Sequence, residues 1–213
     1  MASPEHEGLV MQLIYAFIIP NSGIHVNPPI DIALKSFHYD PSNVRTKIAP
    51  LDPEPPPGDV NLNPHARVIV EVAVTEYLDF LNRKCEKWLL QLYIRSVFRI
   101  KIYDKLKGTN NRTMKAKLWT RQILAPAEST PSTLASWDFG TLQFNSNQPT
   151  GCTGAGLPNY TVTIPVSDVF WDPPIVAGVL NLLGYTAGIS NTVVANNFVI
   201  DLYLLQQIVL LKQ

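Results

Sequence analysis

The chain has 213 residues, of which 46% are hydrophobic and 16% are charged, and its formal net charge is +0. This length and composition exclude an intrinsically disordered chain and predict a single globular domain over residues 1–213. Two cysteines are too few for a disulfide framework, so a reducing, intracellular location is expected.

The first predicted element is a helix near the N-terminus. Ser3 suits the N-cap, Pro4 suits the first helical position, and Glu5 and Glu7 place acids in the first turn. Apolar residues then recur with helical spacing until Pro20 ends the pattern. This apolar stretch is too short to span a bilayer and has no basic flank, so neither a membrane anchor nor a signal peptide is expected.

Extended chain is predicted after this helix. Residues 30–34, Ile-Asp-Ile-Ala-Leu, have the pattern of a short strand, with Asp31 among apolar neighbours. Residues 52–59 contain four prolines and lack donors for a central strand. We interpret this proline-rich run as a surface loop within the domain.

A buried strand is predicted over residues 67–74, Arg-Val-Ile-Val-Glu-Val-Ala-Val. A continuous β-branched, apolar run is typical of a strand buried on both faces. Glu71 stands in its middle, and an unpaired buried carboxylate is costly. A helix predicted over residues 76–92 brings Arg83, Lys84 and Lys87 within reach of the strand's end. We therefore expect Glu71 to be one arm of a metal site.

Two alternating runs, residues 97–103 and 115–121, predict a β-hairpin. Apolar residues lie on one face of this hairpin and basic residues on the other. The basic residues are Arg99, Lys101, Lys115 and Lys117. An exposed cationic face of this kind suits a DNA phosphate backbone, and the alternative is an ordinary solvent face of a meander.

The distribution of charge supports the same expectation. Twelve of the seventeen basic residues lie between Arg83 and Arg121, together with two acids, Glu86 and Asp104. Such a local excess is a candidate electrostatic footprint for nucleic acid. A solvated, lysine-rich surface remains the alternative interpretation.

The C-terminal half predicts further strands and a terminal helix. Strands are expected at residues 137–144 and 160–166, and the glycine-rich residues 151–156 have the wrong spacing for a phosphate-binding loop. Residues 198–211 are strongly apolar and predict a packed helix. Core closure and a homodimer surface both remain open for this last segment.

Three of these segments together resemble the PD-(D/E)xK restriction-endonuclease-like superfamily, closest to its bacterial-type family and the eukaryotic relatives of that family. Residues 29–34, Pro-Ile-Asp-Ile-Ala-Leu, match the Pro-Asp strand of that family with one inserted residue. Residues 64–73 resemble its Val-Glu-Val strand, and residues 84–88, Lys-Cys-Glu-Lys-Trp, resemble its helix with a lysine four residues before an aromatic residue. The resemblance covers about residues 5–105.

The resemblance implies a restriction-endonuclease-like α/β fold, in which a mixed central β-sheet is flanked by helices and followed by extra C-terminal strands and a terminal helix. It also implies a DNA endonuclease that depends on Mg²⁺ or Mn²⁺. Asp31 and Glu71 would bind the metal, and Lys84 would assist catalysis. Such a metal polarises a phosphoryl oxygen and generates hydroxide from bound water, while a lysine stabilises the developing charge.

The catalytic lysine departs from the pattern of the superfamily. That lysine usually lies two residues after the second acid, where this chain has Ala73. Activity therefore requires a migrated lysine, for which Lys84 is the first candidate and Lys87 and Lys101 are the next. Without such a lysine, the expected alternative is a catalytically inactive nuclease-fold module that binds nucleic acid or a protein partner.

The first acid also departs from the pattern. Asp31 and Glu71 are far apart in the sequence for this motif, although the proline-rich residues 52–59 can absorb the difference. Asp59 is the alternative first acid, in a looser Gly-Asp-Val context.

Overall fold

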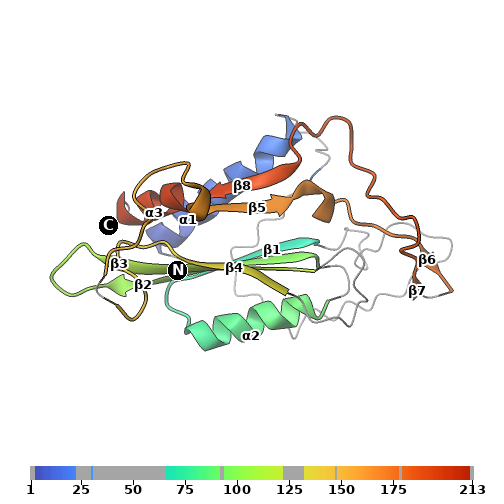
Figure 1. The fold of residues 1–213 in the computed structure, drawn as a ribbon. Coiled ribbons are helices and arrows are strands. Elements are labelled where there is room, and N and C mark those ends of the chain that lie inside the picture. The colour runs from blue at the N-terminus through green and yellow to red at the C-terminus, as the bar shows by residue number, and fades with distance from the viewer. Residues whose placement is uncertain are drawn as a thin grey trace.

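The protein is described here by a computed structural model that covers residues 3–22, 30, 66–91, 94–121, 132–146, 148–177 and 179–211. Its centre is a four-stranded mixed sheet with helices on both sides (Figure 1). This arrangement confirms the predicted α/β class with a mixed, helix-flanked sheet, followed by C-terminal strands and a terminal helix.

The central sheet has the strand order β1-β2-β3-β4. Strand β1 runs parallel to β2, while β2 with β3 and β3 with β4 are antiparallel. A parallel pair needs a crossover connection, and helix α2 supplies it between β1 and β2. The bounds of these elements are Val68–Ala73 for β1, Leu78–Leu89 for α2, Ser96–Lys105 for β2, Arg112–Thr120 for β3 and Ser132–Asp138 for β4.

The predicted hairpin is confirmed as strands β2 and β3. Their register aligns Arg99 with Lys117 and Lys101 with Lys115, so the four basic side chains share one face of the sheet. The predicted strand at 67–74 is confirmed as β1, but it is only partly buried over most of its length. It lies at one edge of the described sheet, where a strand has a neighbour on one side alone.

One face of the sheet carries the main hydrophobic core. Strands β2 and β3 contribute alternate apolar residues, among them Phe98, Ile100 and Met114, which are completely buried. Helices α1 and α3 and the paired strands β5 and β8 cover this face, whereas α2 covers the other (Figure 1). The bounds are Pro4–Ile18 for α1, Thr161–Pro165 for β5, Asn197–Asp201 for β8 and Leu202–Leu211 for α3.

The first helix forms where its capping signals predict it. Ser3 caps α1 by accepting a hydrogen bond from the backbone N–H of His6 at 3.3 Å. Leu9, Leu13 and Phe17 of α1 are buried in the main core. Within the described ranges, no helix has both the length and the apolar character needed to cross a membrane.

The apolar segment 198–211 is not one helix. Its first residues form β8, in which Phe198 and Ile200 point into the core, and the helix α3 begins only at Leu202. Alternate inward residues identify the strand, although the same run also suits a buried helix. Leu205 and Val209 of α3 are buried as well, so the segment closes the core.

The remaining described elements are short. They comprise the 3-10 helices η1 at Ile19–Asn21, η3 at Pro158–Tyr160 and η4 at Val166–Asp168, and the paired strands β6 at Ile175–Val176 and β7 at Val179–Leu180. The predicted strand at 160–166 is confirmed as β5. The strand predicted at 137–144 begins earlier, as β4, and ends at Asp138.

Gly140 is required by a close approach of two backbone segments. A Cβ atom at this position would lie 2.2 Å from the carbonyl oxygen of Arg112 and 2.6 Å from the backbone nitrogen of Met114. Because both atoms belong to strand β3, Gly140→Ala should lower the free energy of unfolding by about 3 kcal/mol in urea denaturation. Gly154→Ala is the control, since no atom lies within 4 Å of its added Cβ. Equal stability of the two variants would contradict this packing.

Both cysteine thiols are free and buried. Burial is the main cause that raises the pKa of Cys85 to about 12 and that of Cys152 to about 11. Native protein at pH 8 should therefore resist a thiol reagent such as dithionitrobenzoate, whereas urea-unfolded protein should react at both positions. The unfolded thiols ionise near pH 9, so the free energy of unfolding should fall as the pH rises from about 9 toward these raised values. Rapid labelling of the native protein would show that the thiols are accessible.

Candidate active site

Glu71 lies in β1 with its side chain on the face that α2 covers. Its neighbours Val70 and Val72 pack against the main core on the opposite face, because successive side chains of a strand alternate. Lys84 Nζ lies 2.8 Å from Oε2 of Glu71, and Trp88 Nε1 donates a hydrogen bond of 2.7 Å to Oε1. Both carboxylate oxygens therefore have a cationic or N–H partner from the same helix.

Helix geometry explains why these two partners act together. Lys84 and Trp88 are four residues apart, so they share one face of α2. Cys85 and Leu89 point toward the sheet and form a small core with Val97, which docks the helix. The side chain of Glu71 is 13% exposed, so the ion pair is largely shielded from water.

The structure brings together two of the three predicted catalytic residues, Glu71 and Lys84. The other candidate lysines are placed differently: Lys87 is exposed on α2, and Lys101 donates a hydrogen bond to the carbonyl of Val74. Asp31 and Asp59, the two candidates for the first acid, lie outside the described residues. The catalytic roles remain predictions.

The described residues do not complete a metal site. Mg²⁺ binds several oxygen ligands, and a carboxylate such as Glu71 is of the right chemical type. In the part of the chain that the structure describes, however, no three His, Cys, Asp or Glu side chains are grouped closely enough to hold a metal ion. Among the predicted ligands, Glu71 is the one that the structure describes, and the prediction of a magnesium site stays untested.

The expectation of an exposed basic face is wrong for Arg99 and Lys101. Both side chains are buried, Arg99 at 3% and Lys101 at 5% exposure. Arg99 donates a hydrogen bond to Asn82 Oδ1 on α2, and Lys101 reaches a backbone carbonyl. Burial lowers the pKa of each side chain from its ordinary value. Their burial leaves little of either side chain accessible to a ligand.

Lys115 and Lys117 are the accessible members of the basic face. Both are partly exposed and lie on β3, one strand further from α2. The Nζ atom of Lys117 lies 4.4 Å from the ring centroid of Trp119, and that of Lys115 lies 4.3 Å from the centroid of Phe144. These cation–π contacts hold the two ammonium groups along the sheet.

The count of basic residues overstates the accessible positive surface. Five of the twelve between Arg83 and Arg121 are buried: Arg95, Arg99, Lys101, Arg112 and Arg121. Arg95 is completely buried, donates a 2.6 Å hydrogen bond to the carbonyl of Arg121, and lies 4.5 Å from the ring centroid of Trp171. These arginines have structural partners, which a count of charges along the sequence does not reveal.

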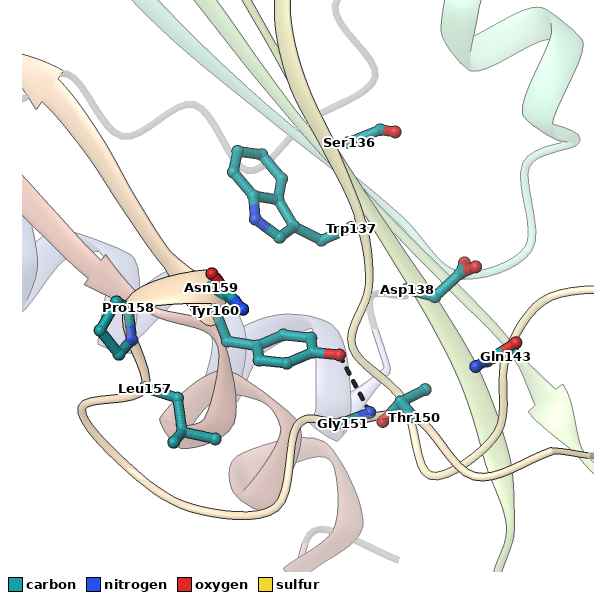
Figure 2. A pocket seen from close by; sticks show the side chains of 10 residues that line it. All are labelled: Ser136, Trp137, Asp138, Gln143, Thr150, Gly151, Leu157, Pro158, Asn159 and Tyr160. Atoms are coloured by element: carbon teal, nitrogen blue, oxygen red, sulfur yellow. Dashed lines mark hydrogen bonds between the residues drawn. The ribbon is translucent and has the colours of Figure 1, made fainter.

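A pocket at the outer edge of β4 is absent from the sequence predictions. Its volume is about 610 Å³, and Figure 2 shows the ten side chains that line it. Three come from consecutive positions of β4, and the others come from residues 143–160. The two aromatic rings, Trp137 and Tyr160, are separated by more than twenty residues, so no local motif marked the pocket.

No family model, curated protein or solved structure matches this chain. The resemblance to the restriction-endonuclease-like superfamily therefore stays a prediction.

The link between Glu71 and Lys84 can be measured by a double-mutant cycle. Glu71→Gln and Lys84→Met should show a coupling free energy of about 1 kcal/mol in urea unfolding, because the pair is close and largely shielded. Lys87→Met is the matched control on the exposed face of the same helix, and it should couple to Glu71→Gln by about zero. Equal coupling for the two lysines would contradict the specific pairing.

Proposed function

We propose that this chain is a Mg²⁺-dependent DNA endonuclease of the restriction-endonuclease-like fold. The observation that supports the proposal is the pairing of Glu71 on β1 with Lys84 on α2, at an N–O distance of 2.8 Å. This pairing supplies an acid and a lysine in one place although Ala73 occupies the usual lysine position. A strand and the helix after it provide both groups, so their geometry rests on regular structure.

Each residue has a distinct role in this proposal. Lys84 places an ammonium group where it can stabilise negative charge that develops on a phosphoryl oxygen. Trp88 orients the Glu71 carboxylate through its indole N–H. Asp31 and Glu71 are the proposed ligands of Mg²⁺ or Mn²⁺, which supplies Lewis-acid chemistry when bound.

DNA contacts are assigned to the open part of the basic face. Lys115 and Lys117 are partly exposed and would contact phosphates directly. Arg99 and Lys101 would act through their positive potential, because both side chains are buried. Phosphate contacts of this kind give binding that weakens as salt concentration rises.

A second candidate function is a catalytically inactive module of the same fold that binds nucleic acid or a protein partner. A specific observation favours it: both oxygens of Glu71 already have partners in Lys84 and Trp88. In this case Glu71 would join β1 to α2, and Lys115 and Lys117 would bind DNA without cleavage.

An intracellular location and a homodimer belong to the same proposal. Part of the apolar segment 198–211 faces solvent, with Val199, Leu204 and Leu211 exposed. A second copy of the chain would cover these side chains, and light scattering at several protein concentrations measures that association.

Cleavage of supercoiled plasmid tests the nuclease. Wild-type protein should nick or linearise the plasmid in Mg²⁺ or Mn²⁺ but not in excess chelator. Glu71→Ala and Lys84→Ala should each lower the rate by about 100-fold or more, because each removes a group that acts on the reacting phosphate. Lys87→Ala on the same helix should retain the wild-type rate.

Other outcomes separate the two candidates. Folded wild-type protein that binds DNA without cleavage, and loses salt-sensitive binding in Lys115→Ala/Lys117→Ala, would favour the inactive module. Protein that neither cleaves nor binds DNA would contradict the nuclease and the DNA-binding form of the inactive module, and would leave only a protein partner for that module.

A further inference from the structure

The pocket beside β4 lies across the outer edge of the strand. Ser136, Trp137 and Asp138 are consecutive, so their side chains point to alternate faces of the sheet, yet all three line the pocket. Figure 2 shows Trp137 and Tyr160 on one side of the β4 backbone, and Ser136, Asp138 and Gln143 on the other. A single cavity that touches both groups has to run along the edge between them.

One wall of the pocket is aromatic and is held in a defined position. Trp137 and Tyr160 are both half-buried against the main core. The backbone N–H of Gly151 donates a 2.9 Å hydrogen bond to the Tyr160 hydroxyl (Figure 2). A Cβ atom at Gly151 would lie 2.9 Å from the same hydroxyl oxygen, so a larger residue there would displace the end of the Tyr160 side chain. The hydrogen bond from Gly151 therefore orients the Tyr160 hydroxyl at the pocket.

The remaining walls supply hydrogen-bonding groups. Asn159 and Gln143 line the pocket from exposed positions, and each carries an amide that both donates and accepts. Asp138 also lines the pocket, but its Oδ1 atom is buried and faces Lys115 rather than the pocket opening. An aromatic wall with amides beside it suits a flat heterocycle that has its own donors and acceptors.

Positive charge adjoins the pocket. Lys115 Nζ lies 3.9 Å from Asp138 Oδ1, on the strand next to β4. Lys117 is directly opposite Ser136 in the register of β3 and β4. Both lysines belong to the open part of the basic face, so a ligand in the pocket would have ammonium groups beside it. This placement favours a ligand that carries phosphate.

We propose that the β4-edge pocket binds one unstacked nucleobase of a DNA strand whose phosphates lie along Lys115 and Lys117. The volume of about 610 Å³ is within the range of clefts that bind small ligands. Bases within a duplex are stacked, so the pocket takes a base from a single strand, a frayed end or an extruded position. The inference rests on the proposed function, because it identifies the form of DNA that this surface recognises.

Fluorescence of 2-aminopurine tests the pocket directly, because stacking on an aromatic ring quenches this base. The probes are its deoxyribonucleoside monophosphate and a single-stranded oligonucleotide that contains it. Wild-type protein should quench the monophosphate, and it should bind the oligonucleotide with a change in fluorescence, because the base exchanges its neighbours for Tyr160. Asn159→Ala should weaken binding of the oligonucleotide, and Tyr160→Ala should weaken it by about 10-fold, since base stacking is lost.

Matched variants distinguish the loss of base stacking from the loss of protein stability. Tyr160→Phe keeps the ring and should retain quenching, whereas Tyr160→Ala removes it. Asn197→Ala, on an exposed position of β8 outside the pocket, should leave binding unchanged. Asn159 is exposed, so its variant stays informative even if Tyr160→Ala loses stability.

The outcomes distinguish this inference from the proposed function. Duplex binding or cleavage with no pocket-dependent quenching would overturn the nucleobase site and leave the proposed function in place. Quenching that Asn159→Ala and Tyr160→Ala weaken, without duplex binding or cleavage, would support the pocket and contradict the proposed function. Equal quenching by wild type and both pocket variants would also overturn the site.

Discussion

The contact of Glu71 with Lys84 and Trp88 is the interaction on which the candidate site depends. A carboxylate on a largely apolar strand needs compensation, and one helix provides both an ammonium group and an indole N–H. The same helix forms the crossover that makes β1 and β2 parallel. The packing of α2 on the sheet therefore both neutralises Glu71 and closes the small core beneath the helix. Together these contacts hold Glu71 and Lys84 in place.

Helix α2 also divides the basic face of the sheet into two parts. Arg99 is buried against Asn82 of α2, and Lys101 is buried against the carbonyl of Val74, in the segment that leads from β1 to α2. Lys115 and Lys117 lie beyond α2 and keep contact with solvent. Buried cations still raise the potential over the sheet, while accessible cations can contact a ligand. Strands β2 and β3 carry these basic side chains on one face of the sheet. Packing over that face determines which of them are buried and which reach solvent.

The candidate active site and the β4-edge pocket lie on two opposite edges of the same described sheet. Glu71 is on β1 and Asp138 is on β4, with β2 and β3 between them. The register places Arg99, Lys117 and Ser136 in one row from Glu71 across the sheet. Arg99 is buried beneath α2, so the accessible part of this row is Lys117 and Ser136, beside the pocket. Helix α2 therefore separates the proposed cleavage site from the proposed nucleobase site on this face of the sheet.

Local signals in the sequence determined the helix after Ser3, the hairpin of β2 and β3, and the proximity of Lys84 to Glu71, because capping, alternation and short-range connection act over a few residues. Only the tertiary structure decided that Arg99 and Lys101 are buried, that residues 198–211 divide into β8 and α3, and that Trp137 and Tyr160 line one pocket. Exposure depends on which element packs over a side chain, and a pocket depends on which distant segments meet. Neither quantity is encoded in the spacing of neighbouring residues.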